Sequence, residues 1–328
     1  MSFDNLNTAV TKKVNLLLMV FLAFIASAVT LFVPFISFAG LAFLPVPAGL
    51  LLALNRVRDA VICAVVGVLL FFLFSYVIAL VLLVIIAGIA FAYRYLSNRD
   101  KKVAFTLVMV FLIFLSSVFL FLLVNSAILQ KNSLADISER YTEYVDSLPQ
   151  DDAISAYKSF LMIEESQFDT VIQQVQSVLR FIPKLLPGLI IVFFGFVTVL
   201  NYGFSSLLFK RYNARINTLS VFKDWDLSWY WCWGVITGIV LVIIPSFNSR
   251  YDLIIDAAGY NLIIIFGCLY LVLGIATLWG IFERFNIRNS LKYLIMLAIF
   301  LFFGLFLFLP VLGLIDIWAN FRKLDRSH

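Results

Sequence analysis

The feature that most constrains this chain is a succession of long apolar runs without a charged residue. One of them, Ala60–Tyr93, exceeds one membrane-crossing helix, since about 20 residues at a rise of about 1.5 Å each traverse the hydrocarbon layer. In the whole chain 63% of residues are hydrophobic and 13% are charged, and the mean hydropathy is +1.04. A water-soluble protein carries about 25% charged residues. Lipid therefore has to be the solvent for most of this polypeptide.

The lengths of the runs predict an all-α, polytopic transmembrane helical bundle of eight to nine spans. Two crossings share the run Ala60–Tyr93, with a tight turn expected near Ser75–Tyr76. The second candidate contains Pro45 and Pro47 and is short, so we expect a broken or re-entrant element there. The nine candidates are Val14–Phe38, Leu41–Leu54, Ala60–Tyr76, Val77–Tyr93, Val103–Ile128, Phe181–Phe209, Trp229–Phe247, Leu253–Phe282 and Leu291–Trp318.

Lysine and arginine predict the orientation, because cytoplasmic loops of membrane proteins retain most of the bases. With Lys12 and Lys13 in the cytoplasm, alternate loops hold nearly all other bases, and the opposite connections hold almost none except Arg250. We therefore predict a cytoplasmic N-terminus. Nine full crossings would place Arg322, Lys323 and Arg326 outside, against this rule. Three alternatives stay open: the last run does not cross fully, the second element does not cross, or the terminal bases are tolerated.

One polar segment separates the fifth span from the sixth. Gln130–Arg180 holds nine of the 19 acidic residues. A turn at Pro149 leads into a helix, and the apolar residues that follow it recur at helical spacing. Two or three amphipathic helices are expected there, forming an external cap that is too small for an independent enzyme core. The chain then divides into an N-terminal membrane region (1–128), an acidic extracytoplasmic insert (129–180) and a C-terminal membrane region (181–328).

The sequence contains no motif for catalysis or metal binding. A phosphate-binding loop, a dinucleotide fingerprint, an HExxH motif and a nucleophile elbow are all missing, and the one histidine is His328. Cys63, Cys232 and Cys268 lie inside apolar runs without metal-ligand spacing and are interpreted as packing residues. We expect no enzyme, no cofactor and no metal site. The bases lie in short loops, which indicates contact with lipid headgroups and no nucleic acid.

Polar side chains at membrane depth are the main functional candidates, because they cost free energy unless they meet a partner or water. Interhelical hydrogen bonds are the favoured interpretation for the asparagines and tyrosines. For the two aspartates a site and a structural ion pair are equally supported, with Arg250 and Arg322 as the expected bases. The tryptophans indicate interfacial anchoring or partner docking. The candidate ligand-binding residues are Asp256, Asn261, Tyr260, Asn201 and Asn125, and the candidate structural or partner residues are Asp316, Trp318, Arg322 and Trp225.

Three segments together resemble a bacterial family. They are Asn201-Tyr202 followed by Leu207, Lys210 and Arg211; Phe222, Trp225 and Leu227 ahead of Trp229; and Gly313–Lys323. Their order and spacing are similar to those of the YybS-like family of bacterial integral membrane proteins, a domain of unknown function, over nearly the whole chain. This resemblance implies a multi-pass protein of the bacterial inner (cytoplasmic) membrane, and it transfers no catalytic residue.

The first six spans are also similar to the substrate-binding subunits of energy-coupling-factor vitamin transporters. The similarity rests on the Pro-containing second element, the basic turn Asn55–Asp59 and Gly67 in the third span. It implies a ligand pocket that opens to the outside under the insert.

Two hypotheses about function follow. The first is a transport-related protein that binds a small molecule in an outward-facing pocket and depends on an energising partner or a gradient, since the chain has no nucleotide site. The second is a non-transport envelope scaffold or regulator that acts through the acidic cap or the Trp-rich loop. A polar cavity at mid-depth favours the first hypothesis and a packed apolar interior the second. Ligand, partners and oligomeric state are left open.

Overall fold

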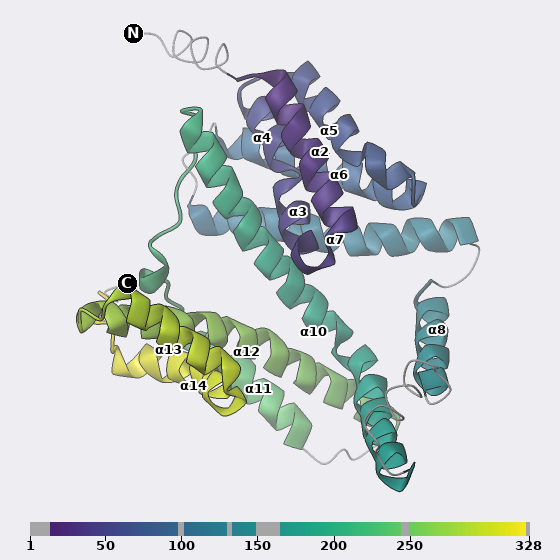
Figure 1. The fold of residues 1–328 in the computed structure, drawn as a ribbon, viewed down its shortest axis with the longest axis vertical. Coiled ribbons are helices and arrows are strands. Elements are labelled where there is room, and N and C mark those ends of the chain that lie inside the picture. Colours follow the sequence, from purple (N-terminus) through teal and green to yellow (C-terminus); the bar gives the residue numbers. More distant parts are fainter. Residues whose placement is uncertain (1–13, 98–101, 130–132, 149–164, 244–248, 326–328) are drawn as a thin grey trace. The chain divides into compact units, whose positions relative to one another are not determined.

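A computed structural model of the chain describes residues 14–97, 102–129, 133–148, 165–243 and 249–325, and every regular element in these ranges is a helix (Figure 1). The α-helices are α2 (Leu16–Phe32), α3 (Ser37–Phe43), α4 (Val46–Ala53), α5 (Val57–Phe72), α6 (Tyr76–Ser97), α7 (Val103–Leu129), α8 (Ser133–Ser147), α10 (Glu165–Arg211), α11 (Cys232–Ile243), α12 (Ser249–Arg284), α13 (Asn289–Leu301) and α14 (Phe303–Ala319). Three 3-10 turns accompany them, η1 (Pro34–Ile36), η3 (Phe222–Asp224) and η4 (Trp229–Trp231).

The chain forms two compact units. Unit 1 combines Met1–Tyr141 with Phe193–Leu219, and unit 2 combines Thr142–Val192 with Ser220–His328. In unit 1, α2 packs on α5, α4 packs on α5 and α6, and α6 packs on α7; the C-terminal half of α10 adds Val197, Tyr202 and Phe209 to their apolar core. In unit 2, α12 packs against α11 and α14. The three regions drawn from composition stay a prediction.

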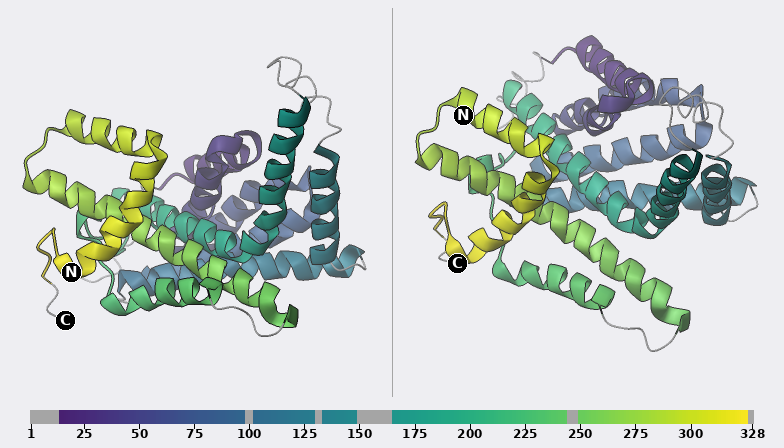
Figure 2. Two further views of the ribbon diagram at one scale, coloured as in Figure 1. Left: turned by 90° about the horizontal axis from the view of Figure 1, so that it is seen from below. Right: turned by 60° about the horizontal axis from the view of Figure 1, so that its bottom comes forward.

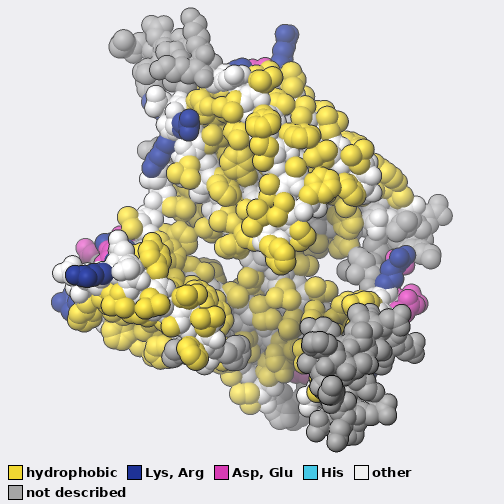
Figure 3. Space-filling model, viewed as in Figure 1, with side chains coloured by type: hydrophobic (Ala, Val, Ile, Leu, Met, Phe, Trp, Pro, Cys, Tyr) yellow, Lys and Arg dark blue, Asp and Glu magenta, His cyan; other side chains and the backbone are white. Residues whose placement is uncertain are grey.

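Apolar helices of membrane-crossing length confirm the polytopic helical class. Five helices have the required length and hydropathy, and a bent pair formed by α13 and α14 raises the number to six. Two more, Leu16–Phe32 and Trp229–Ile243, are apolar but shorter, so the count of eight to nine spans stays a prediction. Apolar side chains cover most of the described surface in view (Figure 3); on α7, Phe119 is 64% exposed and Leu123 70%. Apolar surface on this scale is suited to lipid.

Two predicted interruptions are confirmed. The uncharged run divides at Leu73–Ser75 into α5 and α6, next to the position expected from the sequence. The second element is longer than expected: Pro34–Ala53 is one of the five helices of membrane-crossing length, and it is interrupted at Leu44-Pro45, between α3 and α4. Proline cannot donate a backbone hydrogen bond and disfavours the continuous helix. The element is therefore a broken helix, and six residues in the first part of α4 are buried.

Four helices end on an asparagine in the left-handed region. Asn55, Asn213, Asn286 and Asn320 have φ values of 61°, 54°, 50° and 45° and follow α4, α10, α12 and α14. This conformation turns the next N–H groups back onto the last carbonyls of the helix, and asparagine tolerates it better than most residues. After α10, α12 and α14 an arginine stands two positions beyond the asparagine: Arg215, Arg288 and Arg322.

Helix α10 differs from the expected boundary between insert and membrane. It begins at Glu165 and continues through Pro183 and Pro187 to Arg211, so the end of the insert and the sixth span are one helix. Prolines are tolerated inside membrane helices when neighbouring groups pair the backbone atoms that they free. The last turns of the amphipathic α8, from Thr142 on, contact α10 within unit 2, where Arg180 lies 2.8 Å from Asp146. The turn expected at Pro149 lies outside the described residues, and the external position of the insert stays a prediction.

Glycines bring the backbones of α12 and α14 into direct contact. A Cβ atom at Gly274 would lie 1.9 Å from the carbonyl oxygen of Leu309, and one at Gly313 would lie 2.3 Å from that of Tyr270. Membrane helices associate through such small residues, because lipid supplies no hydrophobic force between helices. The position of α14 on α12 therefore requires glycine at both positions. Figure 2 shows the two helices crossing within unit 2.

Replacing Gly274 with alanine tests this crossing. We expect Gly274→Ala to lower the free energy of unfolding by about 1–3 kcal/mol, as other overpacking substitutions do, because the backbone at Leu309 has to move. Gly267→Ala is the matched control on α12, since nothing lies within 4 Å of its Cβ position. Thermal unfolding of the purified protein in detergent compares the two variants. Equal unfolding midpoints would contradict the close crossing.

Candidate functional site

The polar side chains that the sequence points to occupy three separate places. In unit 1, Asn201 on α10 is fully buried. Its Nδ2 atom donates to the Ala42 carbonyl at 2.7 Å, and the Tyr93 hydroxyl donates to its Oδ1 atom at 2.7 Å. An α-helix would pair the Ala42 carbonyl with the N–H of Val46, which lies beyond the break at Pro45. Asn201 therefore binds the backbone at the end of α3, next to the break in the helix.

Two hydroxyl side chains extend this polar surface along α10. Thr198 and Ser205 lie three residues before and four residues after Asn201, so all three share one helix face, and both hydroxyl residues are buried. Ser205 lies beside the Tyr93 phenol. The Thr198 hydroxyl has no hydrogen-bond partner among the described residues. We call Tyr93, Thr198, Asn201 and Ser205 the unit 1 polar cluster.

Asn261 on α12 makes a second set of bonds, in unit 2. Its Oδ1 accepts from the N–H of Gly188 at 2.5 Å, and its Nδ2 donates to the Lys184 carbonyl at 2.7 Å. These two backbone groups stand four residues apart in α10, the spacing that an α-helix pairs. The Asn261 side-chain amide thus bonds to both the donor and the acceptor of one such helical pair, whose donor Gly188 directly follows Pro187. This is the interhelical hydrogen bonding expected for an asparagine.

The other candidates for a ligand pocket lie near Asn261 or in unit 1. Tyr260 packs edge-to-face on Phe181, with ring centroids 4.8 Å apart, and Asp256 is partly buried one turn earlier on α12. The side chain of Arg250, the expected partner of Asp256, lies outside the described residues. Asn125 is partly buried on α7 and falls in unit 1 with Asn201. No described contact joins these residues with Asn261 and Asn201 in one pocket, so the pocket expected from the sequence stays a prediction.

The expected pair Asp316–Arg322 is confirmed, and it lies at the centre of a third set of contacts. Both side chains are almost fully buried, 1% and 3% exposed, with Nη2 of Arg322 2.8 Å from Oδ2 of Asp316. The second carboxylate oxygen accepts from the N–H of Phe321 at 2.7 Å. Nη1 of Arg322 donates to the carbonyls of Lys223 and Trp225, at 2.8 and 2.6 Å. We call these four residues, Asp316, Arg322, Lys223 and Trp225, the Arg322 hub.

The hub joins two segments that the family resemblance had singled out separately. The loop that contains Phe222 and Trp225 and the C-terminal Gly313–Lys323 lie far apart in sequence and meet at one guanidinium group. Trp225 is oriented by its indole N–H, which donates to the Ser220 carbonyl at 3.1 Å, and by an edge-to-face contact with Phe222. Trp318 is 62% exposed on α14 and takes no part in the hub.

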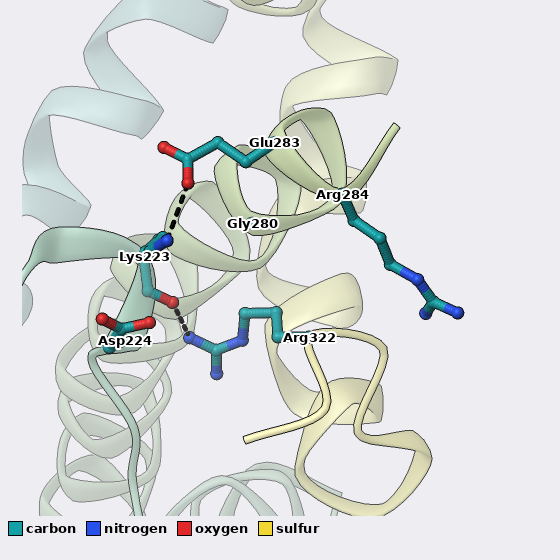
Figure 4. A pocket seen from close by; sticks show the side chains of 6 residues that line it. All are labelled: Lys223, Asp224, Gly280, Glu283, Arg284 and Arg322. Carbon is teal, nitrogen blue, oxygen red and sulfur yellow. Dashed lines mark hydrogen bonds and ion pairs between the residues drawn. The ribbon is translucent and has the colours of Figure 1, made fainter. Parts of the chain in front are cut away.

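A pocket of about 300 Å³ opens beside the hub and is lined by Lys223, Asp224, Gly280, Glu283, Arg284 and Arg322. In Figure 4 the Lys223 side chain points to Glu283, at 2.8 Å, while its backbone carbonyl accepts from Arg322. The hydrogen bond and the charge of Glu283 raise the pKa of Lys223. Gly280 leaves room for the Arg322 stem, because a Cβ atom there would lie 2.9 Å from Arg322 Cγ.

None of the residues expected to bind a ligand lines this pocket. Sequence reasoning also missed Tyr93, Thr198 and Glu283 as partners of the three sets of contacts. Tyr93 and Thr198 read as parts of apolar spans, and nothing in the order of residues connects Glu283 to Lys223. One signal was present: the Asn-x-Arg ending of α10, α12 and α14 marks the helix ends around which basic side chains collect.

Removing Arg322 leaves the Asp316 carboxylate buried without its base. We expect Arg322→Met to lower the free energy of unfolding by about 3–5 kcal/mol, the usual cost of an uncompensated buried charge. The double variant with Asp316→Leu should lose less than the sum of the two single variants. Arg288→Met, at an exposed position before α13, is the control. Denaturation in detergent measures all four; an Arg322→Met effect no larger than the control would contradict the hub.

Comparison with known sequences matches residues 14–317 to one family, described as "Predicted membrane protein (DUF2232)". No curated protein and no solved structure matches the chain. The match covers the unit 1 polar cluster and Asp316, and it bears out an uncharacterised membrane family across nearly the whole chain. The likeness to the YybS-like family and to energy-coupling-factor subunits stays a prediction.

Proposed function

Because the chain belongs to the DUF2232 family of predicted membrane proteins, we propose that it is a non-catalytic membrane protein that binds a small molecule for transport. The proposed binding region is the unit 1 polar cluster. The observation that carries the proposal is a broken helix whose carbonyl end faces a row of polar side chains in an otherwise apolar core. Transporters use broken helices to offer backbone groups to their ligands; here the Ala42 carbonyl at the break is bonded to Asn201.

The unit 1 polar cluster has hydrogen-bonding capacity to spare. Asn201 uses one of its two N–H donors, for Ala42, and accepts one bond, from Tyr93, whereas an amide offers two donors and two lone pairs. Thr198 adds a hydroxyl without a partner among the described residues. A purely structural contact gains nothing from such spare capacity, because unpaired polar groups in an apolar core cost free energy.

The chemistry of the cluster favours a neutral polar ligand. The unit 1 polar cluster consists of one amide, one phenol and two hydroxyl groups. It contains no charged residue, so an ion bound there would lack a counter-charge. The cluster is buried, which corresponds to a closed state; opening toward the outside would create the outward-facing pocket. The proposed ligand is therefore a small uncharged compound with several hydrogen-bonding groups, moved with energy from a partner subunit or a gradient.

A matched pair of threonine variants tests the proposal. Neutral polar compounds, namely sugars, nucleosides and uncharged amides, are screened for thermal stabilisation of the purified protein, since a ligand that binds the folded state raises its unfolding temperature. Thr198→Val should then raise the dissociation constant of a stabilising compound by about 2- to 10-fold, the value of one neutral hydrogen bond. Thr277→Val makes the same change at another buried, unpartnered hydroxyl, in unit 2, and should leave binding unchanged.

Two outcomes would overturn this function. One is that no compound of these classes stabilises the protein; the other is that Thr198→Val and Thr277→Val affect binding equally. Thr198→Val removes no hydrogen bond of the described structure and leaves Asn201 with both of its partners. Loss of folding is therefore not expected to obscure the result.

A second candidate function is that of a membrane scaffold or regulator. The exposed aromatic residues that follow Trp225 in sequence favour this function. Trp229, Tyr230, Trp231 and Trp233 are 59%, 55%, 42% and 57% exposed. Exposed amphipathic rings suit an interface with headgroups or with another membrane protein. A stable complex that is lost when Trp231 and Trp233 are replaced by leucine, together with a negative ligand screen, would favour this candidate.

The same proposal includes the orientation: a protein of the bacterial inner membrane with a cytoplasmic N-terminus and an external acidic insert. It is supported by the collection of bases in alternate loops. A reporter that is active only outside the cytoplasm, inserted after Gln150, should be active, and the same reporter after Ser220 should be inactive. The reverse result would overturn the orientation without affecting the ligand proposal.

A further inference from the structure

The pair α13–α14 returns to the end of the bundle from which it departs. Helix α13 starts five residues after α12 ends at Arg284, and the direction of the chain turns by 113° between α13 and the Phe306–Ala319 part of α14. After α14, the Phe321 carbonyl accepts from Arg284 at 3.0 Å, and Arg322 binds the carbonyl of Lys223. The start of α13 and the end of α14 therefore both lie at the C-terminal end of α12. Figure 2 shows the return path.

We propose that α13 and α14 form a re-entrant hairpin, which enters the bilayer from the side of the Arg322 hub and leaves it on the same side. Lipid acyl chains cover its exposed faces. The proposal places the C-terminus on the side of the basic loops that follow α10 and α12, and it does not depend on the proposed ligand.

The lengths of the two helices fit a hairpin that stops inside the hydrocarbon. Helix α13 has 13 residues, which extend about 20 Å at about 1.5 Å each, against about 30 Å for the hydrocarbon layer. Helix α14 has 17 residues, and its last turn, which contains Asp316, lies at the Arg322 hub. A chain that starts at one interface with α13 reaches past the middle of the layer and turns before the opposite headgroups.

The composition of the turn agrees with this depth. No polar or charged residue occurs between Tyr293 and Asp316, whereas a turn in the opposite headgroup region would meet water and phosphate. Leu301 and Phe302, at the turn, are 73% and 64% exposed. The N–H of Phe302 donates to Ala298 and its carbonyl accepts from Phe306. These two bonds pair the N–H and the carbonyl of Phe302, the residue between the two helices, within the protein, as hydrocarbon demands.

The two ends of the hairpin carry groups typical of one interface. At its start, Lys292 lies over the Trp279 ring, with Nζ 5.5 Å from the centroid, and Tyr293 packs edge-to-face on the same ring. At its end, Asn320 and Arg322 repeat the Asn-x-Arg pattern that closes α10 and α12. Basic residues favour the cytoplasmic side. A hairpin puts the terminal bases on that side and removes the conflict that nine full crossings create.

Cysteine labelling in native membranes tests the hairpin. In a chain with Cys63, Cys232 and Cys268 replaced by alanine, Ser220→Cys, Phe302→Cys and Leu324→Cys are introduced one at a time. A membrane-impermeant maleimide is then added to right-side-out and to inside-out vesicles. We expect Ser220→Cys and Leu324→Cys to react in the same vesicle orientation and Phe302→Cys to react in neither. A nitroxide attached at Phe302→Cys should be relaxed more strongly by oxygen than by a polar nickel complex.

Each other result contradicts the proposal. Reaction of Leu324→Cys and Ser220→Cys in opposite orientations would mean that the last run crosses once. Reaction of Phe302→Cys in the orientation that leaves Ser220→Cys unlabelled would mean two full crossings. If the chain without native cysteines does not fold, fluorescent-protein fragments inserted after Ser220 and attached after His328 answer the same question in the unaltered chain; fluorescence with a cytoplasmic complement from only one of the two sites would overturn the hairpin.

Discussion

A polar group in the apolar interior of this protein is stabilised by partners within the protein, because lipid offers none. Asn201 meets this demand at the broken end of α3, Asn261 meets it at a proline position of α10, and Arg322 meets it with Asp316 and two loop carbonyls. Each side chain bridges segments distant in sequence. The same bonds that satisfy these groups therefore also hold the helices of each unit in place.

The three sets of contacts differ in how many hydrogen-bond donors and acceptors they leave unused. Asn261 bonds to three backbone groups, Gly188, Lys184 and Ala257, and Arg322 is engaged on every side, so both are well suited to structure. The unit 1 polar cluster keeps spare donors and acceptors beside a broken helix, which makes it the best candidate for ligand recognition.

The parts of the fold that were predictable depend on local chemistry. The break at Pro45 follows from a missing N–H, and the turn inside Ala60–Tyr93 follows from the length of a helix that fits the bilayer. The Asp316–Arg322 pair was predictable because a buried carboxylate needs a base and one stands six residues away. The start of α10 was not, since the pattern that marks the insert as amphipathic does not show that its helix continues through Pro183 and Pro187.

What the sequence determined by itself is the solvent of this protein, its helical class, its main interruptions and one ion pair, because each follows from runs of neighbouring residues and their cost in lipid. The tertiary structure alone decided which backbone groups Asn201 and Asn261 bind, which carbonyls Arg322 brings together and where the last helix returns. The position of the last helix depends on Gly274 and Gly313, which let the backbones of α12 and α14 touch. Contact between distant segments is a property of the packed molecule and leaves no local pattern in the chain.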